Sequence, residues 1–160
     1  MRFARTGAVV ADPLVAHDNL DLFLTTWYRA WLGSLPAPHA AILTGIEVGS
    51  AEPADPPFPQ KLLLLRTMDR TRTGLLTADA LVHIEVLAGT RAAPQQAEAI
   101  MRIVLAGLNQ IPGTDLVQVG GLRNPVSAML EQNGPHPVPE KQDRARLFAN
   151  ATLGVTAVAL

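Results

Sequence analysis

Residues 61–89 read KLLLLRTMDRTRTGLLTADALVHIEVLAG and carry the clearest strand signals of the chain. The four leucines that follow Lys61 form a continuous apolar run, which is typical of a strand covered on both faces. The polar residues 69–74 predict a turn. After the turn, Ala80, Val82, Ile84 and Val86 share one face of a long strand, because side chains alternate along a strand. The stretch therefore predicts a hairpin within a larger sheet.

Two amphipathic helices flank this hairpin in the sequence. In residues 17–36, Asp18 or Asn19 can cap the start, and Asp21 lies in the first turn, where the helix dipole favours an anion. In residues 90–113, Pro94 suits the first helical position. The apolar positions that recur at helical spacing are Leu20, Phe23, Leu24, Trp27 and Trp31 in the first helix, and Ala97, Ile100, Met101, Val104, Leu105 and Leu108 in the second.

The remaining elements are shorter. Residues 38–50 (PHAAILTGIEVGS) and 115–122 (DLVQVGGL) predict strands. Residues 123–134 (RNPVSAMLEQNG) predict a short helix capped by Asn124. An alternating strand begins near Arg146 and continues to the last residue, and we expect it at a sheet edge.

These elements predict one domain over residues 1–160, with proline-rich loops near 51–60 and 134–143. The main order is α-β-β-β-α-β-β. Short strands and two long amphipathic helices favour an α+β fold, in which two main helices pack on one face of a single, mostly antiparallel sheet.

The composition narrows the classes of function. The chain has no cysteine, which removes disulfides, thiolate metal sites and thiol nucleophiles. A net charge of -1 argues against a dedicated nucleic-acid binder. Only 17% of residues are charged, and a surface with so few charges suggests that partner proteins cover part of it. The sequence shows neither a basic and apolar leader nor a membrane-length apolar run, so we expect no membrane contact and assembly in cytoplasm.

Two patterns could carry chemistry. Strand alternation places His83 and Glu85 side by side, about 6.6 Å apart, and a metal site would need a further ligand from His17, His39 or His136. Residues 133–147 also contain His136, Glu140 and Asp143 as candidate ligands or acids, but their prolines favour a stiff, extended connector. None of the three serines lies in a Gly-x-Ser-x-Gly motif, so serine hydrolase chemistry has no support.

Basic residues gather in two places. One group is Arg66, Arg70 and Arg72 near the hairpin tip, and the other is Lys141, Arg144 and Arg146. Either group could touch phosphates. Solvated loops or salt bridges across a subunit interface explain them better on a near-neutral chain without interleaved aromatic residues.

The layout of residues 61–160 resembles the tail terminator (tail-completion) proteins of long-tailed bacteriophages, especially those of actinobacterial hosts. The matching parts are a buried strand with an Arg-rich turn (LLLLRTMDRTRTG), a long strand leading into a helix (ADALVHIEVLAGTRAAPQQAEAIMRIVLAGL), a Gly-containing strand (LVQVGGL), a proline-rich loop (NGPHPVPEKQDRARL) and a closing alternating strand. The opening helix LDLFLTTWYRAWLGSLP also fits the family.

The resemblance implies a homo-hexameric ring in the virion that caps the head-proximal end of the tail tube, with no enzymatic activity and no cofactor. Its partners would be itself, the major tail tube protein and the head-tail connector, while DNA would pass through the lumen without sequence-specific binding. Candidate subunit-interface or lumen residues are Arg70, Arg72, Arg144, Arg146, His136 and Glu140. The alternatives are a neighbouring head-tail connector (neck) protein and a small metal-dependent enzyme using His83, Glu85 and His136.

Overall fold

The fold is described by a computed structural model that covers residues 2–3, 9–10, 14–114, 121–139 and 142–160. The elements are β1 (Arg2–Phe3), β2 (Val9–Val10), β3 (Val15–Ala16), α1 (Leu20–Ser34), α2 (His39–Ile42), β4 (Glu47–Gly49), β5 (Leu62–Arg72), β6 (Thr77–Ala88), α3 (Gln95–Leu108), β7 (Val126–Pro137), β8 (Ala145–Thr156) and β9 (Val158–Ala159).

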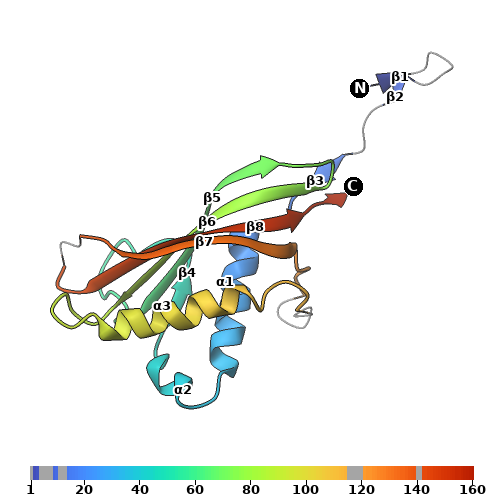
Figure 1. The fold of residues 1–160 in the computed structure, drawn as a ribbon. Coiled ribbons are helices and arrows are strands. Elements are labelled where there is room, and N and C mark those ends of the chain that lie inside the picture. The colour runs from blue at the N-terminus through green and yellow to red at the C-terminus, as the bar shows by residue number, and fades with distance from the viewer. Residues whose placement is uncertain (1, 4–8, 11–13, 115–120, 140–141) are drawn as a thin grey trace.

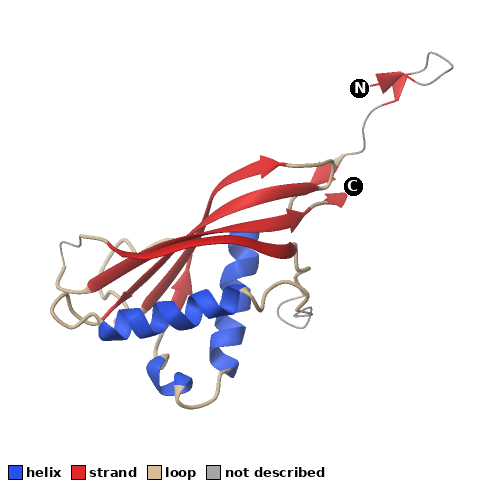
Figure 2. Ribbon diagram, viewed as in Figure 1, coloured by secondary structure: helices blue, strands red, loops and turns tan. Residues whose placement is uncertain are grey.

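Five strands form the main sheet in the order β4-β5-β6-β8-β7. Its pairs are antiparallel except β4 with β5, which is parallel. β1 with β2 and β3 with β9 form two small antiparallel pairs. Figures 1 and 2 show α1 and α3 on one face of the main sheet, which we call the inner face. The predicted α+β fold with a mostly antiparallel sheet is therefore confirmed.

The core lies between the inner face and the two long helices. On β6 the predicted inward residues Ala80, Val82, Ile84 and Val86 are all fully buried. Along β8, buried and partly exposed residues alternate without a break from Ala145 to Thr156. Because one face of each strand is small and apolar, both helices can pack closely against the sheet.

An aromatic cluster joins α1 to α3. Trp27 stacks on Trp31 at a centroid distance of 5.2 Å, and Tyr28 packs edge-on to Trp27 at 5.0 Å. The Tyr28 hydroxyl donates a 2.7 Å hydrogen bond to the backbone oxygen of Val104 in α3. Complete burial raises the pKa of Tyr28 well above its usual value, because the phenolate would lose its hydration.

Helix starts agree with the sequence to within a residue. The Asn19 side chain accepts from the Leu22 amide and caps α1, as predicted. Asp21 has a second role, since its carboxylate accepts hydrogen bonds from the amide and hydroxyl of Thr67 at 2.6 and 2.7 Å. Pro94 is the residue before α3 begins, one position earlier than expected. The polar start of α1 therefore also fixes the position of this helix against the sheet.

Two predicted elements are wrong. Residues 38–50 do not form one strand, because 39–42 form the short helix α2 and only Glu47–Gly49 pairs with β5. Residues 126–137 form β7 where a short helix and then a loop were expected. The Asn124 side chain does accept from the Val126 amide, as a cap would, but the chain continues as a strand along β8. The strand predicted at 115–122 falls mostly on residues outside the described part.

The last long strand is not at an edge. β8 lies between β6 and β7 and pairs with both over most of its length. The long open edge is β7, whose pairing with β8 is interrupted by three register shifts. The first hairpin strand also runs further than predicted, because β5 continues to Arg72 and the tip is 73–76.

Candidate functional site

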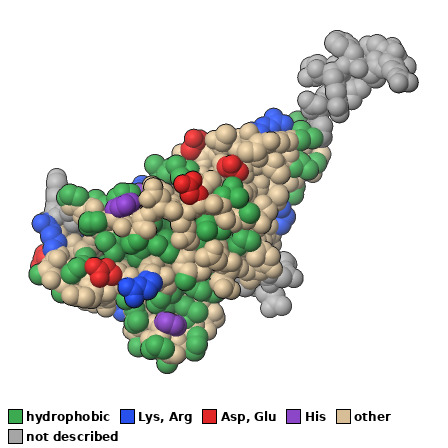
Figure 3. All heavy atoms as spheres, in the orientation of Figure 1, with side chains coloured by type: hydrophobic (Ala, Val, Ile, Leu, Met, Phe, Trp, Pro, Cys, Tyr) green, Lys and Arg blue, Asp and Glu red, His purple; other side chains and the backbone are tan. Residues whose placement is uncertain are grey.

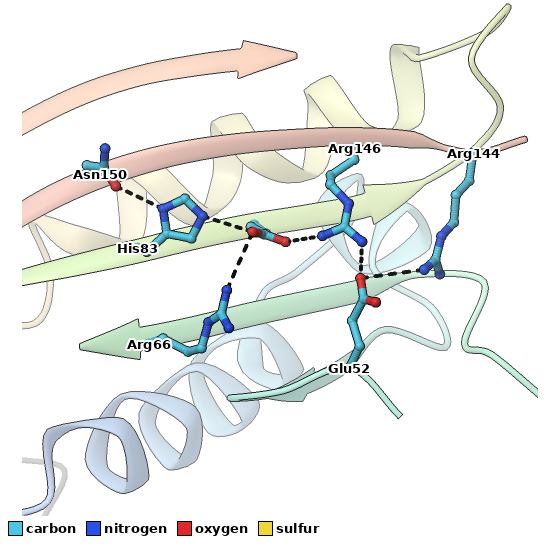
Figure 4. Close-up of polar contacts among 7 residues, drawn as sticks. Glu52, Arg66, His83, Arg144, Arg146 and Asn150 are labelled. Carbon is cyan, nitrogen blue, oxygen red and sulfur yellow. Dashed lines mark hydrogen bonds and ion pairs between the residues drawn. The ribbon is translucent and has the colours of Figure 1, made fainter. Parts of the chain in front are cut away.

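A polar network occupies the outer face of the sheet, opposite the helices. The register places Arg66 of β5 beside His83 of β6, and His83 beside Asn150 of β8. Glu85 follows His83 on the same face of β6, as strand alternation predicted. Figure 4 shows Asn150, His83 and Arg66 on three neighbouring strands of the sheet.

Glu85 is the centre of this network. Its carboxylate accepts from His83 Nε2 at 2.9 Å and from Arg146 Nη1 at 2.5 Å, and Arg66 Nη2 lies 3.7 Å away. His83 Nδ1 is 2.9 Å from Asn150 Oδ1, so both ring nitrogens are engaged. Glu85 is only 8% exposed, and a buried carboxylate needs such partners to remain charged.

The proline-rich loop closes the network from outside. We call residues 50–60 the strap. Glu52 in the strap accepts a hydrogen bond from Arg146 Nη2 and lies 3.6 Å from Arg144 Nη2. The Arg144 guanidinium also lies 5.7 Å from the ring centroid of Phe58, at the other end of the strap. The strap therefore reaches from the edge of the sheet to the arginines of β8 and the segment before it (Figure 4).

The histidines do not form the proposed metal triad. His83 and His136 both pack against Phe148, at centroid distances of 5.5 and 5.2 Å, so an aromatic ring lies between them. In the part of the chain that the structure describes, no group of three or more His, Asp or Glu side chains could hold a metal ion. Both Glu85 oxygens are already bound to cations or to His83, so this carboxylate is not an open acid or base.

The other candidate residues are spread over the molecule. Arg70 donates to the backbone oxygen of Asp18 at 3.5 Å, and Arg72 donates to that of Gly74 at 2.9 Å, both near the hairpin tip. Burial, followed by the charge of Arg70, lowers the pKa of His17 below its usual value. His136 is exposed on β7, and Glu140 lies outside the described residues.

Arg144 and Arg146 are the two predicted residues that the fold brings into the network. Their side chains are only 11% and 17% exposed, because they pair with Glu52 and Glu85 of the same chain. Sequence reasoning missed Glu52 and Asn150 as members. Glu52 was visible only as an acid in a loop, and Asn150 becomes a neighbour of His83 only through the β6–β8 register.

A cavity of about 620 Å³ lies between α3 and the ends of β7 and β8, and it borders the network, because Arg144 and Arg146 are part of its lining. Its lining mixes apolar and charged residues, including Arg91, Glu98, Arg102, Leu105, Pro137 and Leu147. In the space-filling view, apolar side chains on the visible face are interspersed with a few charged groups (Figure 3). The cavity lies at the end of the sheet opposite the β5–β6 tip, because Ala145 pairs with Ala88 and Thr156 pairs with Thr77.

Comparison with known proteins identifies no relative: no family model matches the sequence, and no curated protein matches it. Among the described residues, no helix is long and apolar enough to cross a membrane. Function is therefore inferred from the surfaces of the fold.

Proposed function

We propose that the protein is a tail terminator of a long-tailed bacteriophage: a ring of identical subunits that ends the tail tube and joins it to the head connector. The observation that carries the proposal is a sheet with two unlike edges that are not fully paired with other strands. One edge is β7, and the other is β5 beyond Leu64, because β4 pairs only with Leu62–Leu64 and the start of α1 bonds this edge at Thr67 through Asp21. A closed ring needs two different surfaces on each subunit, and exposed strand edges are usually covered by a partner.

The two ends of the sheet are also unlike. The β5–β6 hairpin extends beyond the helices (Figure 1) and exposes Leu75 by 45% and Leu76 by 37% near its tip. The opposite end carries the cavity beside α3. An apolar projection at one end and a cavity at the other suit contacts between successive copies or with a tail or connector protein.

The charge distribution suits a passage for DNA. The chain has a net charge of -1, and Arg144 and Arg146 form ion pairs with acids of the same chain. A channel with few free cations would let DNA slide, since each phosphate contact adds salt-sensitive affinity. In this proposal Arg70, Arg72 and His136 lie at a subunit interface or the lumen.

Mass measurement tests the proposal. Light scattering of the purified protein, alone and with major tail tube protein, should show a ring-sized assembly, expected to be a hexamer. Addition of the protein to polymerising tube protein should also stop tube growth. A protein that stays monomeric at high concentration with tube protein present, and leaves tube length unchanged, would exclude this role.

Position in the particle separates the terminator from the neck protein. A gold label on the subunit should lie at the junction of tail tube and head, and loss of the gene should give overgrown tails. Tails of normal length that lack heads would assign the protein to the connector instead.

A further inference from the structure

The strap is attached to the sheet almost entirely through side chains. No backbone hydrogen bond joins residues 50–60 to other described residues, whereas Glu52 and Phe58 contact Arg144 and Arg146. The two ends of the strap are held together, since the Glu47 amide donates to the Lys61 oxygen at 3.0 Å and β4 pairs with β5. The strap can therefore leave the sheet as a unit without disturbing the strands.

The strap end of the outer face combines apolar and charged side chains. Leu62, Leu64 and Leu87 form a small apolar cluster there, each no more than 3% exposed. The strap begins after the edge strand β4, yet Glu52 reaches Arg146 on β8, so it extends over the outer side of β5 and β6. One continuous surface therefore lies beneath the strap. It is formed by the three leucines, by Arg144 and Arg146, and by the buried carboxylate of Glu85.

The strap is held loosely on this surface. Arg144 Nε is buried and has no hydrogen-bond partner among the described residues. The Arg144–Glu52 contact is 3.6 Å, longer than a good charge-assisted hydrogen bond. An unpaired donor and a long contact weaken the attachment of the strap to the arginines, which lowers the free-energy cost of its release.

We propose that this surface is a docking site for an extended, proline-rich segment that carries a carboxylate and an aromatic ring, and that in the assembled protein the occupant is the strap of a second copy. The inference rests on the proposed ring, which places copies side by side. The strap is the segment whose chemistry is seen to fit, because Glu52 meets the arginine pair and Phe58 meets the Arg144 guanidinium.

Exchange of the strap between copies should cost little free energy. Every contact made within one chain can re-form between two chains, so little interaction energy is lost. The four prolines of the strap restrict its free conformations, which lowers the entropy lost on docking. In a ring, each exchanged strap would tie a subunit to its neighbour.

A peptide assay tests the docking surface. The probe is a fluorescent peptide of residues 50–60, and the receptor is the full chain carrying Glu52→Ala and Phe58→Ala, which weakens its own strap. We expect the peptide to bind this variant at least about tenfold more tightly than the wild-type chain, whose own strap competes. A peptide with Glu52→Gln should lose most of this affinity. Equal binding of both peptides, or no binding to a variant that circular dichroism shows to be folded, would overturn the proposal.

Cross-linking tests the exchange. Because the chain has no native cysteine, the cross-linker joins only the introduced thiols. Chains carrying Ala54→Cys in the strap are mixed with chains carrying Asp143→Cys beside Arg144 and treated with a short bis-maleimide. Covalent dimers should appear in the assembled fraction, and far fewer should form when Gln110→Cys, an exposed position at the far end of α3 from Asp143, replaces Asp143→Cys.

The two proposals fail in different ways. Rings that form normally while links arise only within a chain carrying both cysteines would overturn strap exchange and leave the terminator role intact. Absence of any assembly would contradict the terminator role, and with it the second copy as occupant.

Discussion

At the scale of single residues, the outer-face network shows how a charged group is kept inside a small domain. Glu85 is flanked by His83 on its own strand and by arginines from β5 and β8. Any of these partners alone would leave the carboxylate poorly solvated, since burial of a charge is costly unless it is paired and hydrogen-bonded. The network is thus a structural unit whose members depend on one another.

Replacement of Glu85 by Gln should lower the free energy of unfolding by about 1–3 kcal/mol, because Arg146 and Arg66 lose a buried counter-charge. Urea unfolding at neutral pH measures the change. Glu131→Gln is the matched control on exposed β7, and it should shift stability by less than about 0.5 kcal/mol. Equal effects of the two substitutions would mean that the network contributes nothing beyond surface charge.

Tyr28 should make the protein sensitive to alkali. Its pKa is raised in the folded state, so the unfolded chain releases the phenolic proton first, near the usual pKa of 10.0. Stability is therefore fully present below that pH and should fall above it by up to about 1.4 kcal/mol per pH unit.

Comparison with Tyr28→Phe isolates this effect. The variant should be about 1 kcal/mol less stable at neutral pH, since it lacks the hydrogen bond to Val104, but its decline above about pH 10 should be shallower. Tyr28 is the chain's single tyrosine, so tyrosinate absorption reports this residue directly. Tyrosinate absorption that rises before circular dichroism is lost would show that the buried hydroxyl is accessible, contrary to prediction.

At the scale of elements, periodicity identified the two long helices and the β5–β6 hairpin, because each buries a continuous apolar stripe. Local sequence signals gave a wrong prediction for β7, which was expected to be a short helix. Asn124, Pro125 and Gly134 are placed as helix start and stop residues, and the segment between them contains good helix formers. The segment forms a strand because β8 presents a long row of backbone groups that needs a partner, and no local pattern encodes that requirement.

Close packing of α1 on α3 depends on Gly107. A Cβ there would lie 2.6 Å from the Trp31 ring, so Gly107→Ala should destabilise the protein by about 1–3 kcal/mol despite its better helix propensity. Gly33→Ala is the matched control, because nothing lies within 4 Å of its added Cβ, and it should be neutral or stabilising by up to about 1 kcal/mol. Urea midpoints followed by tryptophan fluorescence measure both, and a neutral Gly107→Ala would mean that Trp31 moves aside freely.

At the scale of the whole molecule, the faces and edges of the sheet are covered to different extents. The helices cover the inner face and the strap covers one end of the outer face, while β7 and the hairpin tip stay open and β5 beyond Leu64 has no strand partner on its outer side (Figures 1 and 2). A monomer gains nothing from such surfaces, whereas a ring would cover them.

The hairpin tip gives a test at this scale. Leu75→Ser combined with Leu76→Ser should reduce formation of the proposed ring at least about tenfold in concentration, while the monomer should stay folded because both side chains are partly exposed and lie outside the core. Leu22→Ser, at another exposed leucine on α1, should assemble normally. Native mass spectrometry across a dilution series measures the assembly, and unchanged ring formation in the double variant would remove the tip from the interface.

The sequence by itself determined the α+β class, both long helices, the central hairpin and the pairing of His83 with Glu85, because each depends on spacing within one segment. Only the tertiary structure decided that β8 is internal, that β7 is a strand, that Arg146 and Asn150 meet Glu85 and His83, and that Glu52 meets Arg146. These outcomes depend on strand order and register, which bring together groups far apart in the chain. Their energy comes from contacts between segments, and local periodicity carries no information about which segments will meet.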